Sequence, residues 1–310
     1  MGTSHPIVSV VVPVRDNAEG IRSLLSCLER QTIGRERFEV LIADDGSRVP
    51  PGVAGESVRV LSGPPLTSYA ARNRAASEAR ADLLAFCDSD CRPDPRWLEE
   101  GLALLAVADV VGGEVLFTPP ARPTVWSLLT MDMFLDQARS LRLSKGVTAN
   151  LLVRREHFER LGGFDESLPS GGDYDFVSRS VEAGARHVFA PGAVVRHPTL
   201  DRGRPFLRKV WNTNRWAAAR RAREGRLPSI AGAFAFVPVV GVVLARRHAL
   251  RPVTRLHRPR LEASGVRAGW REDLRALPVL YAVVAYTAGF AQLRGWMLGR
   301  RMARRSGAAQ

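Results

Sequence analysis

The sequence predicts an α/β fold in which a mostly parallel sheet is flanked by helices. Short apolar segments alternate with helical patterns over the first hundred residues, as in chains that build a parallel sheet wrapped by helices. The apolar segments 7–14 and 38–43 are almost uninterrupted, which is typical of strands buried on both faces. Acidic residues follow several of these segments directly. Since ligands bind at the carboxyl ends of strands in such sheets, a functional site is expected there.

Each element has its own signal in the sequence. Ile21, Leu24 and Leu28 have helical spacing, residues 68–79 are rich in alanine, and Pro95 stands where the next helix begins. Glycines end two later helices, at residue 162 and residue 184. Strands are predicted at 7–14, 38–43, 58–61, 83–87, 110–117, 147–153 and 193–195. Helices are predicted at 19–31, 68–79, 96–108, 124–143, 155–161 and 173–183.

The charge of the chain is distributed unevenly. The net charge is +14, but residues 1–200 carry 22 basic and 26 acidic side chains, whereas residues 201–310 carry 23 and 5. We therefore expect two domains, a globular one over 1–200 and a basic one over 201–310. The cysteines, at 27, 87 and 91, are too few for a disulfide framework and indicate a reducing compartment. No second Cys/His pair has zinc-finger spacing, which disfavours a zinc site.

Two uncharged stretches in the basic region, 227–245 and 276–293, reach the length at which a membrane span becomes plausible. Arginines flank both, and eight more lie at 246–271 between them, so exporting that loop would violate the positive-inside rule. Pro238 lies near the middle of the first stretch and Pro278 early in the second, which also fits bent or re-entrant segments. We expect both stretches to be hairpin-like or interfacial segments in the cytoplasmic leaflet, placing the chain on the cytoplasmic face of the cell membrane. The alternative is two buried helices of a larger soluble fold.

Three acidic clusters follow predicted strands and are expected to meet at one sheet edge. They are Asp16-Asn17, Asp44-Asp45 and Asp88-Ser89-Asp90. Two carboxylates separated by one residue at a strand end can face one divalent cation, and Mn²⁺ or Mg²⁺ prefers such oxygen ligands. The alternative is an aspartate-rich turn, with Asp94 capping the following helix.

The chain resembles family 2 inverting glycosyltransferases, which have the GT-A fold. The resemblance covers roughly residues 6–200 and rests on six segments that match the family in order and spacing. They are VSVVVPVRDN, LIADDGS, AARNRA, FCDSDC, RREHFERLGGFDESL and GGDYDFVSRSVEAG. It implies an enzyme that binds a nucleotide diphosphate sugar, with FCDSDC as the family's Asp-X-Asp (DxD) metal motif.

The resemblance also implies roles for individual residues around the nucleotide. Pro13 and Arg15 would line the nucleotide pocket, and Arg72 and Asn73 would contact the nucleotide. Asp45 would accept a hydrogen bond from the base, with Asp44 as the alternative. Asp88 would bind the ribose or the metal, and Asp90 the metal.

The third group of implied residues comes from the second half of the domain. Asp173 matches the catalytic base, although Gly172 stands where the family usually has the glutamate of a Glu-Asp pair. Asp175 is the competing carboxylate, and Arg179 could bind the diphosphate. His197 follows an apolar strand and would be a third metal ligand beside Asp88 and Asp90.

Together these features predict metal-dependent, inverting transfer of a sugar to an acceptor hydroxyl. UDP is the expected leaving group, and a saccharide or lipid-linked acceptor in cell-surface glycan or cell wall polysaccharide synthesis is the expected partner. A catalytically inactive nucleotide-sugar-binding protein remains an alternative, because of Gly172. A nucleotidyltransferase is disfavoured by the lack of a glycine-rich phosphate loop after the first strand. A nucleic-acid-binding protein is disfavoured because the basic residues surround apolar stretches, a pattern that membrane lipid explains better.

Overall fold

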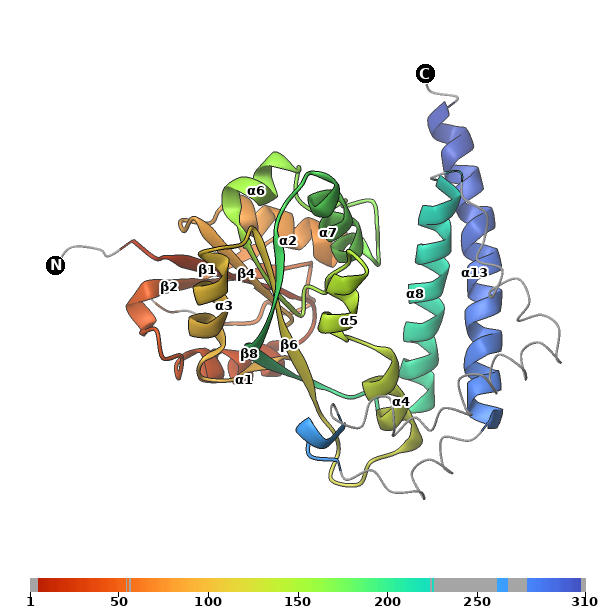
Figure 1. Ribbon diagram of the computed structural model, residues 1–310, viewed down its shortest axis with the longest axis horizontal. Coiled ribbons are helices and arrows are strands. Elements are labelled where there is room, and N and C mark those ends of the chain that lie inside the picture. The colour runs from red at the N-terminus through yellow and green to blue at the C-terminus, as the bar shows by residue number, and fades with distance from the viewer. Residues whose placement is uncertain are drawn as a thin grey trace. The chain divides into compact units, whose positions relative to one another are not determined.

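The computed structural model describes residues 5–53, 55, 57–223, 225, 261–266 and 278–307, and the chain divides into two compact units (Figure 1). The first unit comprises Met1–Phe117 and Leu135–Pro198, and the second comprises Thr118–Phe134 and Thr199–Gln310. Residues 118–134 thus belong to the second unit, although they precede residue 200 in the sequence.

The first unit is an α/β domain with one sheet of eight strands. Its strands are β1 (Val8–Val14), β2 (Phe38–Asp44), β3 (Val58–Ser62), β4 (Leu83–Cys87), β5 (Arg92–Pro93), β6 (Val110–Thr118), β7 (Asn150–Arg154) and β8 (His187–Pro198). Its helices are α1 (Ala18–Leu28), the short 3₁₀ helix η1 (Arg35–Arg37), α2 (Ser68–Ser77), α3 (Trp97–Leu105), α5 (Gln137–Arg142), α6 (Arg155–Arg160) and α7 (Gly172–Glu182).

The sheet order is β3-β2-β1-β4-β7-β6-β8-β5. The first four strands in this order pair in parallel, as predicted. Beyond them β7 pairs antiparallel with both β4 and β6, and β5 pairs antiparallel with β8, so the sheet is mixed. The parallel half carries the strand ends at which the acidic clusters were expected.

Alternate residues of the central strands pack into two apolar layers. One face of the sheet, with Val10 and Val12, is covered by α1 and α3 through residues such as Ile21 and Trp97. The other face, with Val11, is covered by α2, α6 and α7. Because both faces are buried, the central strands carry almost no polar residues, which explains the uninterrupted apolar segments in the sequence.

One predicted helix is divided in the structure. Residues 124–143 form two helices, α4 (Val125–Met133) and α5, instead of one. Phe134 is extended, with φ −120° and ψ 157°, and Leu135 has a left-handed backbone, with φ 54°. Asp136 then caps α5 by accepting a hydrogen bond from the Arg139 amide at 2.8 Å. The break coincides with the boundary between the two units.

The second unit is helical where it is described. Helix α4 packs on α8 (Gly203–Arg223) through a small cluster in which Leu129, Phe206 and Val210 are buried. Helix α13 (Pro278–Gly307) lies alongside α8 (Figure 1). Gly295 and Gly299 face the α8 backbone so closely that a Cβ at either position would overlap it, so these glycines permit the close approach.

The apolar stretches of the sequence are only partly covered by the description. Residues 227–245 lie outside the described residues, and most of 276–293 falls within α13. Among the residues that the structure describes, no helix combines the length and the apolar character needed to cross a bilayer.

Candidate active site

The loops that follow β1, β2 and β4 meet at one edge of the sheet, as the sequence predicted. The Asn17 amide, after β1, donates to Ser89 Oγ, after β4, at 3.1 Å. The backbone amide of Asp16, which has a left-handed φ of 53°, donates to Ser47 Oγ at 2.9 Å. Hydrogen bonds therefore connect the three loops that carry the acidic clusters.

The two carboxylates at the end of β2 accept hydrogen bonds from neighbouring loops and from the end of β3. Asp44 is buried, and its two oxygens accept from the Ser47 amide at 3.0 Å and from Ser62 Oγ at 3.3 Å. Asp45 accepts from the amide of Leu66 at 2.9 Å. These contacts shape the loops around the predicted nucleotide site. Pro13 is buried in β1 opposite Ala43, and Arg15 is exposed just beyond the strand end.

Helix α2 connects to the loop after β4 through Arg72. This buried arginine donates from Nη2 to Asp88 Oδ1 at 2.5 Å, and it also lies over the ring of Tyr69, one turn earlier. A buried guanidinium beside a half-exposed carboxylate holds Asp88 in place and supplies positive charge to this edge of the sheet.

Asn73, the next residue of α2, contacts protein atoms instead. Its side chain donates to the Phe164 carbonyl at 2.8 Å and to Glu166 at 2.9 Å, and it accepts from the Phe164 amide at 3.0 Å. Asn73 thereby fixes the loop between α6 and α7.

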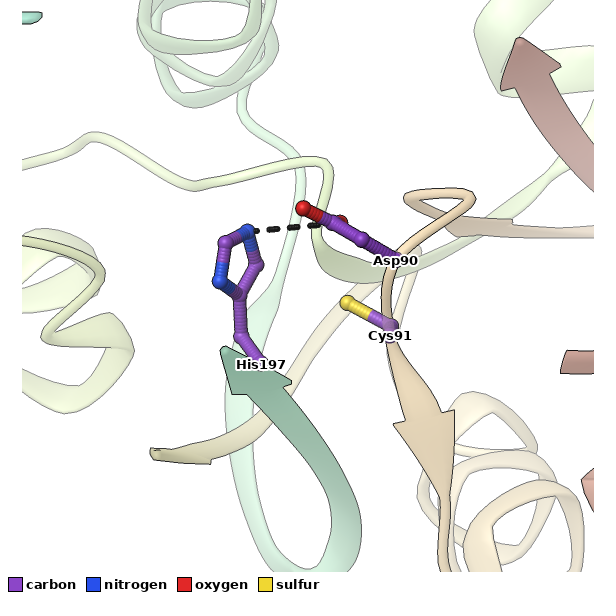
Figure 2. Close-up of side chains that lie close together, drawn as sticks. All are labelled: Asp90, Cys91 and His197. Carbon is purple, nitrogen blue, oxygen red and sulfur yellow. Dashed lines mark ion pairs between the residues drawn. The ribbon is translucent and has the colours of Figure 1, made fainter. Parts of the chain in front are cut away.

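The strongest candidate for a metal site joins Asp90 to His197 at the end of β8 (Figure 2). His197 Nε2 lies 3.5 Å from Asp90 Oδ1, and Nδ1 lies 2.7 Å from the Pro198 carbonyl. A carbonyl can only accept, so Nδ1 carries a hydrogen, and Nε2 is the ring nitrogen that faces Asp90. This orientation by an outer hydrogen bond is the usual arrangement of a histidine that binds a metal.

Cys91 is the third member of this group, and the sequence did not select it. A possible ligand atom from each of Asp90, Cys91 and His197 lies within 4.8 Å of the others. Cys91 is buried, and its hydrogen bond with Cys87 together with its burial raises the pKa of its thiol well above the ordinary value. A thiol that keeps its proton is a poor ligand. Asp90 and His197, one oxygen and one imidazole nitrogen, therefore fit Mn²⁺ or Mg²⁺ better than a thiolate-bound metal.

Asp88 lies near this pair in sequence but not within the group of three. Its oxygen contacts Arg72, as described above. The roles of Asp88 at the metal or the ribose therefore remain a prediction.

Asp173 lies at the start of α7, where three donors surround its carboxylate. Oδ1 accepts from the Tyr69 hydroxyl at 3.0 Å and from the Tyr174 amide at 2.9 Å, and Oδ2 lies 3.3 Å from the Thr148 amide. Burial raises the pKa of Asp173, while these donors and Arg72 act in the opposite direction. A carboxylate with a raised pKa is a stronger base than an exposed aspartate.

Asp175, the competing carboxylate, is bound to Arg179 on the next turn of α7. Arg179 Nε donates to Asp175 at 2.8 Å, and its terminal nitrogens donate to the carbonyls of Leu161 at 2.6 Å and Gly163 at 2.7 Å. The pair ties α7 to the turn after α6. The proposed contact of Arg179 with a diphosphate remains a prediction.

Comparisons with known proteins identify the family of this fold. The model of "Glycosyl transferase family 2" matches residues 9–162. Glycosyltransferase AglE of Haloferax volcanii is 34% identical over 219 residues, which are 66% of this chain and 70% of that protein. The pre-mycofactocin glycosyltransferase of Mycobacterium tuberculosis is 34% identical over 217 residues, which are 63% of this chain and 43% of that protein.

Among solved structures, the mannosyltransferase PcManGT from Pyrobaculum calidifontis, in complex with GDP-Man and Mn²⁺, has a similar fold. Its TM-score is 0.55 at 18% identity, and the alignment covers 97% of this chain and 87% of that one. The fold, the strand-end site and these relatives together define a glycosyltransferase. The chain belongs to glycosyl transferase family 2.

Sequence reasoning missed two residues of the site. Tyr69 precedes Arg72 by one helical turn, so its place on the same face of α2 could have been inferred from the spacing. The partnership of Cys91 with His197 could not, because it depends on the strand order that places β5 beside β8.

Proposed function

We propose that this glycosyltransferase moves a sugar from a nucleotide diphosphate donor to an acceptor hydroxyl with the help of a divalent metal, inverting the anomeric configuration. The observation that carries the proposal is the geometry of His197. Its Nδ1 donates a hydrogen bond to the Pro198 carbonyl, and its Nε2 faces Asp90. Asp90 and His197 would hold the metal, with Asp88 beside them. The complex of the similarly folded PcManGT with GDP-Man and Mn²⁺ supports this choice of cofactor.

The donor would bind at the edge formed by the loops after β1, β2 and β4. Pro13 and Arg15 would line the nucleotide pocket, and Asp45, or else Asp44, would accept a hydrogen bond from the base. Arg72 would act beside Asp88, to which it already donates. Asn73 and Arg179 would contribute indirectly, by holding the loop between α6 and α7 in place. Their side chains donate hydrogen bonds to backbone carbonyls of that loop. We propose a UDP-sugar as the donor.

The chemistry follows from the position of Asp173. Its carboxylate would accept the proton of the acceptor hydroxyl as that oxygen forms a bond to the anomeric carbon. The bond between this carbon and the diphosphate oxygen breaks at the same time, and the diphosphate leaves with the electron pair. Attack from the face opposite the leaving group inverts the configuration. A metal bound at the site would stabilise the negative charge of the leaving diphosphate.

The acceptor is proposed to be a saccharide or a lipid-linked saccharide in cell-surface glycan or cell wall polysaccharide synthesis, at the cytoplasmic face of the cell membrane. A cavity of about 550 Å³ between α8 and α13 supports the membrane part of this proposal. Its lining combines apolar and cationic side chains: Trp211, Leu293, Met297, Arg215, Arg294 and Arg301. Leu293 and Met297 are exposed large hydrophobic residues on α13. Apolar side chains beside arginines match a surface of anionic lipids.

The experiment that tests the proposed function is a panel of nucleotide sugars incubated with the full chain. Release of nucleoside diphosphate is measured with Mn²⁺, and again after EDTA. We expect turnover of at least one donor, its loss with EDTA and its recovery with added Mn²⁺. Turnover that EDTA leaves unchanged would contradict metal dependence.

A further inference from the structure

The base proposed above, Asp173, is connected to helix α2 by one tyrosine. Tyr69 is 6% exposed, and its hydroxyl donates to Asp173 Oδ1 at 3.0 Å. The hydroxyl oxygen of Tyr69 in turn accepts a hydrogen bond from the backbone amide of Gly171 at 3.1 Å. A single hydroxyl therefore binds the carboxylate and also the residue just before α7.

The ring of Tyr69 also occupies the space beside position 172. A Cβ at Gly172 would lie 2.9 Å from two ring carbons of Tyr69, closer than real Cβ contacts. No larger side chain can occupy position 172 while the ring is there. This explains why the residue before Asp173 is a glycine, where the resemblance led us to expect a glutamate.

We propose that Tyr69 is the positioning residue of Asp173. Residue 172 is a glycine because a larger side chain there would displace the Tyr69 ring. Tyr69 supplies the support that an acidic neighbour at position 172 would otherwise give. The inference rests on the proposed function, since it takes Asp173 as the base. It concerns the orientation and proton affinity of that base, not contact with substrate.

The groups that face Asp173 determine the expected direction of the effect. Arg72 and Tyr69 face it from α2, the Thr148 amide from the segment before β7, and Tyr174 from α7 itself. The hydroxyl of Tyr69 remains a donor at all ordinary pH values, because burial raises its pKa. Its hydrogen bond favours the ionised carboxylate and so lowers the pKa of Asp173. Removing the hydroxyl should therefore raise that pKa further.

The first test is Tyr69→Phe, which keeps the ring and its packing 5.5 Å from Phe164. The pH dependence of kcat/KM is measured for the full chain with its donor and Mn²⁺. We expect the acid limb to move upward by roughly one pH unit, because a hydrogen bond to a charged group is lost. On that limb kcat should fall roughly ten-fold, while KM for the donor stays within about two-fold. Tyr286→Phe removes a tyrosine hydroxyl on α13, outside the groups that face Asp173, and should leave the acid limb in place.

The second test is Gly172→Ala, in which the new Cβ displaces the Tyr69 ring. Displacing a buried ring costs about 1–3 kcal/mol, so thermal unfolding is measured beside activity to show that the variant is folded. We expect the same upward movement of the acid limb as in Tyr69→Phe. If the acid limb of the pH profile moves in neither variant, the inference is overturned.

Asp173→Asn separates this inference from the proposed function. If Asp173→Asn loses turnover while Tyr69→Phe and Gly172→Ala keep the wild-type pH profile, the base assignment stands and the role of Tyr69 falls. If Asp173→Asn retains wild-type turnover, Asp173 is not the base, and both are overturned.

Discussion

At the scale of single residues, the structure distinguishes two aspartates that the sequence left as competitors. Asp173 and Asp175 are two positions apart on α7, so their side chains leave the helix in different directions. Asp175 binds Arg179 and the turn after α6. Asp173 binds Tyr69 and the segment before β7, close to the strand ends. The geometry favours Asp173 as the base.

This assignment predicts different results for two matched variants. Asp173→Asn keeps the shape of the side chain but cannot take up a proton, so turnover should fall roughly 10²–10⁴-fold. Donor binding, measured by calorimetry, should remain. Asp175→Asn weakens only the pair with Arg179 and should keep turnover within about ten-fold of the wild type. Loss of turnover in Asp175→Asn with normal turnover in Asp173→Asn would mean that the carboxylates are wrongly assigned.

Individual contacts were harder to predict than the location of the site. The sequence placed Asp16, Asp45 and Asp90 at one sheet edge because each follows a strand. It could not show that the polar groups of Asn73 and Arg179 are bonded to backbone between residues 161 and 164. Those contacts are made across 16 to 91 residues of chain, and sequence spacing carries no information about them.

At the scale of elements, one buried asparagine joins the antiparallel half of the sheet. Asn150 begins β7 and is fully buried. It accepts from Trp97 Nε1 of α3 at 2.8 Å and donates to the carbonyls of Glu114 in β6 at 2.9 Å and Ala193 in β8 at 2.7 Å. The side chain thus satisfies one buried donor and two buried acceptors from three elements.

Replacing Asn150 with leucine should destabilise the fold strongly. The substitution keeps most of the volume but leaves buried polar groups without a partner, at about 1–3 kcal/mol each. We expect the free energy of unfolding in urea to fall by about 3–5 kcal/mol. Asn212→Leu, on an exposed position of α8, is the control and should change it by less than about 0.5 kcal/mol. Equal stabilities of the two variants would show that Asn150 does not join these elements.

The elements themselves were largely predictable, and their arrangement was not. The β-branched and alanine-rich patterns located β1, β2, α2 and β4 to within one or two residues. The antiparallel insertion of β7 between β4 and β6 depends on tertiary pairing that has no local signal. The break at Leu135 was missed because its left-handed backbone occurs at a residue that rarely adopts it.

At the scale of the whole molecule, the charge asymmetry of the sequence corresponds to two units of different character. The first unit is the α/β domain that carries the site, and the second contains the basic helices α8 and α13. The cavity between these helices gives the proposed membrane contact a defined location, with Arg301 in its lining. Arg300, its neighbour, lies over the ring of Trp296 and does not line the cavity.

This difference between adjacent arginines allows a charge-matched test. Binding of the full chain is measured by sedimentation with vesicles of anionic phospholipid and with vesicles of phosphatidylcholine alone. We expect binding to the anionic vesicles only. Arg301→Gln should weaken it about five-fold, since an arginine near such a surface contributes about 1 kcal/mol. Arg300→Gln should weaken it less than about two-fold. Equal effects of the two variants would contradict a role for the cavity.

In the proposed mechanism, Asp90 and His197 hold a metal that the donor's diphosphate requires. The most direct measurement is the Kd of UDP and of GDP in calorimetric titrations, with Mn²⁺ and with EDTA. For the wild type we predict that one of the two binds at least ten-fold more tightly with Mn²⁺, because an ion held at this site would offset the negative charge of the diphosphate. In Asp90→Ala and His197→Ala this advantage should disappear, while Asp82→Ala, an exposed carboxylate paired with Arg155, should keep it. An undiminished advantage of Mn²⁺ in Asp90→Ala would contradict the account.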